Sequence, residues 1–299
     1  MKITAHQKGI LWLLLAVFLL ASKGIFVKFV YQYSVTPVEI LLVRILFSLP
    51  FFLIILWQIW PEERSSLSWS IIWPTAFFGV SGYYVASFFD FWGLLHLPVG
   101  LERLVLFSYP GIVVLLAAAF LKQPLNKRLV FWLILTYVGL CTVFIEDILQ
   151  QSLQSKEQIK GAILVFIAAI SFAIYMVGNE TMQRHISSRM FTCIAMLAAT
   201  VAIIIHYMSL HSWAVLLEIP WQAYAWIFVI AITSTVLPSF LVAAGIREVG
   251  ASVAGIVGST GPVVTVALAF VVLGETLSLL QVVGFVLVMF AVYRLQRSR

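Results

Sequence analysis

The sequence is poor in charge. Lysine, arginine, aspartate and glutamate make up only 10% of the 299 residues, whereas apolar residues make up 63% and the mean hydropathy is +1.07. A soluble domain carries roughly a quarter charged residues, so this chain lacks the polar side chains needed to cover a folded surface in water. The scarcity of charge therefore excludes an ordinary soluble protein and predicts that lipid covers the fold.

Cysteine and catalytic motifs are also scarce. Cys141 and Cys193 lie singly inside apolar runs, without the spacing of a disulfide, metal or redox pair, and are interpreted as small packing residues. There is no H-E-x-x-H, no G-x-S-x-G and no Walker P-loop. These absences argue against an enzyme, and we expect no catalytic residue, no cofactor and no metal.

The sequence does contain many long apolar runs. About 20 apolar residues can cross ~30 Å of hydrocarbon as a helix, and the runs here are continuous, whereas barrel strands would alternate apolar and polar residues. We predict an all-α integral membrane protein of ten transmembrane helices, at residues 9–31, 36–60, 70–95, 98–121, 128–147, 159–180, 188–210, 221–246, 249–273 and 278–296.

The two halves of the chain repeat each other at an offset of 152 positions. Matched residues at this offset include Ser87-Phe88 with Ser239-Phe240, Gly93 with Gly245, Pro110 with Pro262, Leu121 with Leu273, and Lys8-Gly9 with Lys160-Gly161. Leucine matches are easily accidental in an apolar chain, but glycine, proline and Ser-Phe matches at one offset indicate duplication. We predict two repeats, 1–150 and 151–299, joined by the polar stretch from Glu146 to Lys160.

Basic residues mark one side of the membrane. Five helices per half place the second repeat in the membrane with inverted topology. With both termini inside, the external loops hold only Lys156 and Lys160, and the cytoplasmic segments hold Lys2, Lys8, Arg64, Lys122, Lys127, Arg128, Arg184, Arg189, Arg247, Arg294, Arg297 and Arg299. This bias predicts cytoplasmic termini. Because the basic residues lie between apolar runs, the net charge of +6 indicates topology and not nucleic-acid binding.

Two copies of one short pattern carry a family resemblance. They comprise Pro110, Leu121 and Lys122-Gln123-Pro124-Leu125 in the first half, and Pro262, Leu273 and Gly274-Glu275-Thr276-Leu277 in the second. The chain resembles the drug/metabolite transporter superfamily with its paired EamA repeats, although the first copy departs from the usual Gly-Glu pattern. The resemblance covers nearly the whole chain. It implies a ten-helix transporter of amino acids or other metabolites.

Seven ionisable residues fall inside the first four predicted helices. They are Lys23, Lys28, Glu39, Arg44, Asp90, Glu102 and Arg103. A rise of 1.5 Å per residue places all of them in the outer part of the first half. Their counterparts at the 152-residue offset are Tyr175, Glu180, Phe191, Met196, Val242, Ala254 and Gly255, of which only Glu180 is charged. Since the second copy does without these charges, the asymmetry favours a functional role.

The same residues suggest a binding site. We hypothesise that Lys23 and Arg103 bind an anionic group such as a carboxylate, and that Asp90 or Glu102 accepts an amine or a coupling proton. Lys28 and Glu39 are close enough to a boundary to reach the interface. Arg44 could either pair with a carboxylate or take part in the site.

Weaker signals complete the candidate site. Tyr109 and Tyr175 are candidates to contact the substrate, although most aromatic residues in such a chain pack or anchor helices. Pro110 and Pro262 are predicted to kink their helices in mid-span. A stripe of small residues, Ala251, Gly255 and Ser259, predicts close helix packing, either within the bundle or in a homo-oligomer.

The inverted repeat is typical of a secondary transporter working by alternating access, and the resemblance implies an exporter or exchanger of a small polar metabolite. The protein is expected in a bacterial inner membrane. A non-transporting scaffold or assembly protein remains the main alternative, since a fold alone does not determine function. A channel and a membrane-embedded enzyme fit the sequence less well.

Overall fold

The computed structural model describes residues 4–97, 99–150, 156–210, 212–261, 263–264 and 278–296, and this part of the chain contains helices and turns but no β-strand. In the first half the helices are α1 (Ala5–Ala21), α2 (Lys23–Tyr31), α3 (Pro37–Glu63), α4 (Trp69–Gly79), α5 (Ala86–His96), α6 (Val99–Leu106), α7 (Tyr109–Phe120) and α8 (Lys127–Gln150). In the second they are α9 (Lys156–Met182), α10 (Ser188–Leu210), α11 (Trp221–Ala231), α12 (Leu237–Val249), α13 (Ala251–Gly258) and α15 (Leu279–Gln296).

These helices are built for a lipid environment. By length and composition, five described helical runs could cross a membrane: Pro37–Glu63, Leu101–Phe120, Lys156–Met182, Ser188–Leu210 and Trp221–Val249. Large apolar side chains on three different helices are exposed: Trp57 by 79%, Phe120 by 75% and Ile205 by 63%. Apolar surface of this extent is stable only against lipid. Each of the ten predicted ranges coincides with one or more of the helices given above, and of the ninth range residues 249–261 and 263–264 are described.

Several membrane-crossing runs are interrupted. A turn at Ser22 separates α1 from α2, and residues Phe107 and Ser108 separate α6 from α7. Pro110 is in the first turn of α7, where the missing proline N–H has no helical partner to lose. The interruption lies within the turn before Pro110, where a proline disturbs the helix, and it falls in mid-span as the prediction of a kink at Pro110 expects. Pro262 lies outside the described residues.

The internal duplication is visible in the backbone. A π-helical stretch, η2 (Val80–Val85), joins α4 to α5, and a second, η4 (Ile232–Val236), joins α11 to α12. The two stretches begin 152 positions apart, at the offset of the sequence repeat. π-Helical stretches are rare in proteins, and those that do occur are often found at functional sites. Its recurrence at equivalent positions shows that both halves share the same local geometry.

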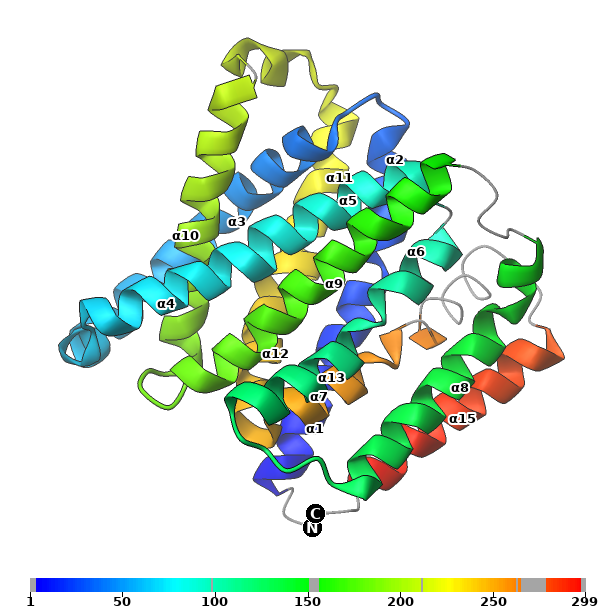
Figure 1. The fold of residues 1–299 in the computed structure, drawn as a ribbon. Coiled ribbons are helices and arrows are strands. Elements are labelled where there is room, and N and C mark those ends of the chain that lie inside the picture. The colour runs from blue at the N-terminus through cyan, green and yellow to red at the C-terminus, as the bar shows by residue number, and fades with distance from the viewer. Residues whose placement is uncertain are drawn as a thin grey trace.

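The halves also pack on each other reciprocally. Helix α1 packs along α12, and its equivalent α9 packs along α5 (Figure 1). The first helix of each half therefore packs against the other half. Glycines permit both approaches: a Cβ on Gly9 would lie 3.4 Å from the Gly245 carbonyl oxygen, and one on Gly161 would lie 3.2 Å from that of Gly93. Larger residues would force these helices apart. The four glycines that indicated duplication in the sequence thus form the contacts between the halves.

The first and last described helices have their terminal ends at the same end of the bundle. Figure 1 shows the start of α1, the end of α15 and the loop between α7 and α8 at the same end of the molecule. Helices α8 and α15 pack side by side at the edge of the bundle. On α13, a Cβ on Gly255 would lie 3.5 Å from Pro110 Cα of α7. At Gly255, the stripe of small residues therefore packs within the bundle.

Candidate functional site

A cavity of about 160 Å³ lies between the two halves. Residues from both repeats line it, including the start of α2, the π-helical stretches η2 and η4, and parts of α9 and α13. Six of the seven predicted site residues are in this lining: Lys23, Arg44, Asp90, Arg103, Tyr109 and Tyr175. The seventh, Glu102, is 1% exposed and contacts Arg103 beside the cavity.

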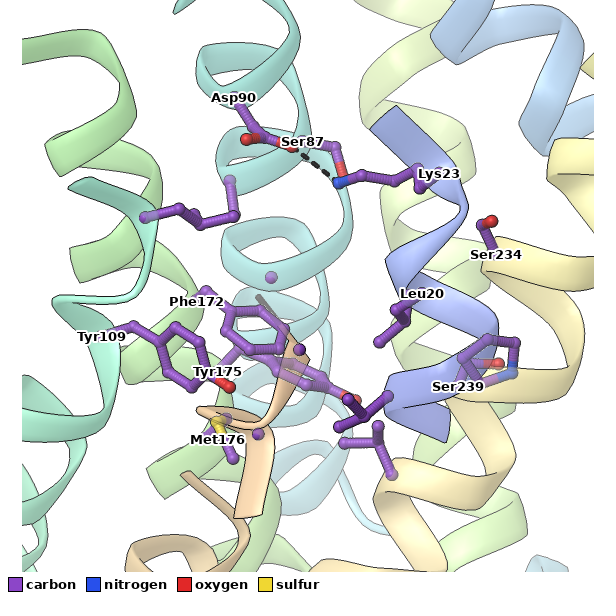
Figure 2. Close-up of a pocket in the computed structure, with 18 of the residues that line it drawn as sticks. Leu20, Lys23, Ser87, Asp90, Tyr109, Phe172, Tyr175, Met176, Ser234 and Ser239 are labelled. Atoms are coloured by element: carbon purple, nitrogen blue, oxygen red, sulfur yellow. Dashed lines mark hydrogen bonds and ion pairs between the residues drawn. The ribbon is translucent and has the colours of Figure 1, made fainter. Parts of the chain in front are cut away.

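Lys23 and Asp90 form an ion pair. The Lys23 Nζ atom donates to Asp90 Oδ2 at 2.6 Å, and the side chains are 14% and 6% exposed. Lys23 is the first residue of α2, so the break at Ser22 positions its side chain, while Asp90 projects from the middle of α5 (Figure 2). Nearby, the Tyr31 hydroxyl donates to the Phe91 carbonyl oxygen at 3.0 Å and ties α2 to α5. The predicted anion-binding lysine is thus already neutralised by a carboxylate.

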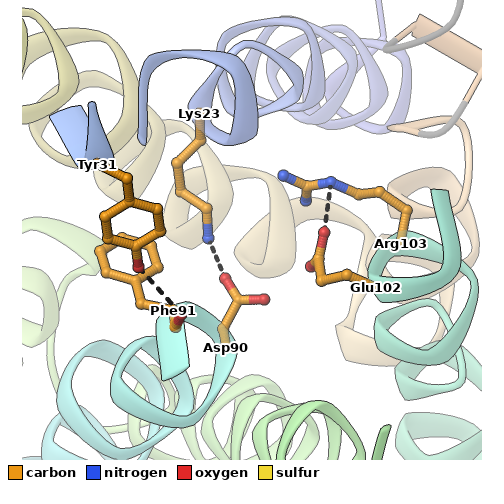
Figure 3. Close-up of polar contacts among 6 residues, drawn as sticks. All are labelled: Lys23, Tyr31, Asp90, Phe91, Glu102 and Arg103. Atoms are coloured by element: carbon orange, nitrogen blue, oxygen red, sulfur yellow. Dashed lines mark hydrogen bonds and ion pairs between the residues drawn. The ribbon is translucent and has the colours of Figure 1, made fainter. Parts of the chain in front are cut away.

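Glu102 and Arg103 form a second charged pair on α6. The Arg103 Nε atom lies 3.2 Å from Glu102 Oε2, yet neither atom completes a well-aligned hydrogen bond within the described residues. Figure 3 shows the Asp90 and Glu102 carboxyl groups lying between the two cations, and the two carboxyls are close enough to affect each other's charge. Asp90 Oδ1 is also buried without a hydrogen-bond partner among the described residues. The cavity therefore begins in a row of four charges whose central members have the same sign.

Arg44 is the remaining charged residue of the cavity. It comes from α3 and is 4% exposed. Its Cζ atom lies 5.4 Å from the centroid of the Phe91 ring, and Lys23 Nζ lies 5.2 Å from the same centroid. Within the described residues, Arg44 has no carboxylate at ion-pair distance, and its Nε atom has no hydrogen-bond partner. Of the two interpretations of Arg44, pairing with a carboxylate finds no support among the described residues, and a part in the site stays a prediction.

An aromatic wall continues from the charged row. The ring of Tyr109 lies 5.7 Å from that of Phe107 and 5.1 Å from that of Phe172, and Phe172 stacks on Tyr175 at 5.7 Å. The Tyr83 and Tyr175 hydroxyls share a hydrogen bond of 2.6 Å. Such rings offer an apolar surface to a ligand, while the Tyr83 and Tyr175 hydroxyls are already engaged with each other.

A hydroxyl-bearing wall faces these rings. Ser234 and Thr235 come from η4 and Ser239 from α12, and Figure 2 shows Ser234 and Ser239 across the cavity from Tyr109 and Tyr175. The Thr235 hydroxyl is buried without a hydrogen-bond partner within the described residues. Sequence reasoning missed this wall because serine and threonine are ordinary packing residues in membrane helices. The match of Ser87 to Ser239 in the repeat was the available signal.

A polar network extends from Tyr175 in the cavity wall along α9. On α9, Tyr175, Asn179 and Gln183 follow one face at four-residue spacing: Asn179 donates to the Tyr175 hydroxyl at 3.2 Å, and Gln183 donates to Asn179 and, at 2.9 Å, to the carbonyl oxygen of Ala243. Both amide side chains are at least nine-tenths buried. The network joins the cavity wall to the end of α9 and to α12.

Glu180 adds a second connection at the same end. It accepts from the Ala251 backbone N–H at 2.6 Å, at the start of α13, and from Gln123 Nε2 at 2.7 Å. Gln123, in the loop between α7 and α8, accepts in turn from the Ser252 hydroxyl at 3.0 Å. A carboxylate at a helix N-terminus is favourably placed. Glu180 therefore holds parts of both repeats together.

Two further ionisable residues do not contribute to the cavity. Glu39 accepts from the Thr36 backbone N–H at 2.7 Å, and the two residues form a capping box at the start of α3. Glu39 is 5% exposed, so the prediction that it extends to the interface was wrong. The Lys28 side chain lies outside the described residues. Within the described ranges, no group of His, Cys, Asp and Glu is arranged to hold a metal ion.

A helical membrane bundle of two repeated halves, with a charged cavity between them, is the architecture of a membrane transporter. The EamA-like transporter family matches the chain twice, over residues 7–145 and 159–295. This protein belongs to that family, and the resemblance seen in its sequence is confirmed. Pro262 and residues 273–277 of the second pattern lie outside the described residues.

Similar proteins agree with this assignment. The uncharacterized transporter YcbK of Bacillus subtilis (strain 168) is 27% identical over 290 residues, which cover 95% of this chain and 91% of that protein. The uncharacterized transporter YyaM of the same organism is 24% identical over 214 residues, covering 72% and 70%. A solved crystal structure matches 97% of each chain with a TM-score of 0.73 at 16% identity, which shows a shared fold. The protein is a multi-pass membrane transporter, and this points away from an enzyme.

Proposed function

We propose that this protein is a secondary transporter that carries a small polar metabolite, such as an amino acid, by alternating access. It would act as an exporter or exchanger in the inner membrane. The observation that carries the proposal is the cavity between the repeats, because it combines charges from the first half with aromatic and hydroxyl groups from the second. In such carriers, one repeat rocks against the other around a central site.

The charged row supplies both a binding surface and a means of coupling. Lys23 and Arg103 present positive charge to an anionic group of the substrate. Asp90 and Glu102 lie between them (Figure 3), and adjacent carboxyl groups in a poorly hydrated site tend to hold one proton between them. A substrate that draws Lys23 away from Asp90 would change how firmly this proton is held. Binding and proton release would then be linked at one place.

The interrupted helices supply the moving parts. The breaks at Ser22 and at Phe107–Ser108, together with η2 and η4, all lie beside the cavity. A helix interruption frees backbone groups and allows its two segments to reorient. These four positions are the proposed hinges for movement between repeats 1–150 and 151–299.

The network around Glu180 is the proposed inner gate. It lies beside the loop between α7 and α8, which contains Lys122, at the end where Figure 1 shows the start of α1 and the end of α15. Basic loops are retained on the cytoplasmic side, so this end is proposed to face the cytoplasm. Breaking the contacts among Glu180, Gln123 and α13 would open the cavity inward.

The test is counterflow in proteoliposomes, with labelled amino acids and related metabolites, with and without a pH gradient. Saturable flux that is lost in K23A and R103A would support the proposal. K127A, which changes an exposed residue outside the cavity, should transport normally. Thermal unfolding of each purified variant separates loss of function from loss of fold. A folded wild-type protein that moves no member of the panel would favour a non-transporting scaffold.

A further inference from the structure

Five charged side chains lie in or beside the described cavity: Lys23, Arg44, Asp90, Glu102 and Arg103. The lysine and Asp90 neutralise each other at 2.6 Å, and Arg103 is matched by Glu102 at 3.2 Å. Arg44 is the fifth member. With both carboxyl groups ionised the set carries one excess positive charge, and with one proton held between Asp90 and Glu102 it carries two; in either state Arg44 has no carboxylate at ion-pair distance among the described residues.

The surroundings of Arg44 do not compensate this charge. The Phe91 ring offers a cation–π contact at 5.4 Å, which is weaker than an ion pair. Asp90 is near enough to interact with Arg44 electrostatically, but its Oδ2 atom already accepts from Lys23. The guanidinium is buried, and its Nε–H has no acceptor within the described residues. A buried, unpaired cation is unfavourable unless an anion joins it.

The fold itself does not require an arginine at this position. The equivalent residue in the second repeat is Met196, which is 1% exposed. An apolar side chain of similar length therefore satisfies the same helix packing. A buried guanidinium with free donors matches the planar geometry of a carboxylate and can bind it through two parallel hydrogen bonds.

We propose that the cavity binds an organic anion with a net charge of minus one, and that Arg44 receives its carboxylate. This inference rests on the proposed transport function and narrows its substrate class. The apolar body of the anion would lie against the rings of Tyr109, Phe172 and Tyr175, which line the same cavity. A monoanion balances the five charges when both carboxyl groups are ionised, and it lowers the excess positive charge when they hold one proton between them. A zwitterion leaves the excess positive charge unchanged, and an amine adds to it.

The test uses probes that share a skeleton and differ in net charge. The aromatic series is 3-phenylpropanoate, phenylalanine and 2-phenylethylamine; the aliphatic series is 4-methylpentanoate, leucine and 3-methylbutylamine. Binding to the detergent-purified full chain is measured by titration calorimetry at neutral pH. In at least one series, the anion should bind about tenfold or more tightly than the zwitterion and the amine, a difference well above the precision of the method.

Variants assign the effect to Arg44. R44Q should abolish the preference for the anion, whereas R44K should keep its direction with weaker binding, since lysine retains the charge but not the planar donor pair. R128Q alters an exposed arginine outside the cavity and should bind like the wild type. Thermal unfolding checks that each variant is folded.

The results separate this inference from the transport proposal. It is overturned if the zwitterion binds as tightly as the anion in both series, if R44Q keeps the preference, or if no probe binds the folded wild type. Counterflow of amino acids that R44Q leaves unchanged would sustain transport and refute the anion site. Conversely, Arg44-dependent anion binding without any saturable flux would sustain the site and refute transport.

Discussion

The ion pair between Lys23 and Asp90 permits a quantitative test of the cavity. Its atoms lie 2.6 Å apart, and both side chains are largely buried. Removing one member of a buried pair leaves an uncompensated charge and typically costs about 3–5 kcal/mol. D90N should approach this cost because it strands the lysine. K23M should cost less, because Asp90 can take up a proton when its partner is lost.

Replacing both Lys23 and Asp90 should restore much of the stability that the single variants lose. In K23M/D90L no charge is stranded, and apolar pairs that replace a buried ion pair are often as stable as the original. The double-mutant cycle should give a coupling energy near the upper end of the roughly 0.5–3 kcal/mol measured for contacting residues. The assay is reversible unfolding in mixed micelles, followed by tryptophan fluorescence. Transport should stay absent in the double variant even where stability returns.

Two outcomes would refute this reasoning. If the unfolding free energy lost in K23M/D90L equals the sum of the losses in the two single variants, the two residues are not energetically coupled. If K23M/D90L transports normally, the pair is a structural contact and not part of the site.

Three further predictions concern single positions. E39A should lower the stability of the fold by about 1 kcal/mol through loss of the capping box with Thr36, and should leave substrate binding unchanged in the same calorimetric titration. G258A should reduce flux, because its Cβ would collide with the Tyr109 hydroxyl and must displace that ring from the cavity; normal flux would show that the ring is free to move. E180A should lower the unfolding free energy by about 0.5–2 kcal/mol, through loss of its hydrogen bond to the first turn of α13. It should also increase alkylation, from the side proposed to be cytoplasmic, of a cysteine introduced in the cavity by S239C.

The helices and their duplication could be predicted from the sequence because both depend on local patterns. A continuous apolar run predicts a membrane helix wherever the run lies in the fold, and the glycine matches needed only alignment of the chain with itself. The capping box at Thr36 and Glu39 was equally readable, since a threonine followed three residues later by glutamate is its signature. The prediction that Glu39 extends to the interface was wrong because it used only the position of Glu39 in the sequence.

The partners of the cavity charges could not be predicted in the same way. The helical rise placed Lys23, Asp90 and Arg103 at one depth, but pairing depends on how each helix is rotated about its axis. That rotation is set by tertiary contacts, such as the close approach of Gly9 to Gly245. The break at Ser22 was missed, because Ser22 is neither a proline nor a glycine. The break at Phe107 lies within one turn of Pro110, which was the local signal for it.

The repeat explains how one cavity acquires two different walls. Positions 152 residues apart line it from opposite halves: Lys23 with Tyr175, Ser87 with Ser239, Asp90 with Val242, and Tyr109 with Gly261. The duplicated backbone therefore builds the cavity symmetrically, while the side chains differ between the halves. At the two positions that form the ion pair in the first half, the second half has a tyrosine and a valine, so no equivalent ion pair can form there. A substrate is consequently expected to bind in one orientation, with its charged group toward the first repeat.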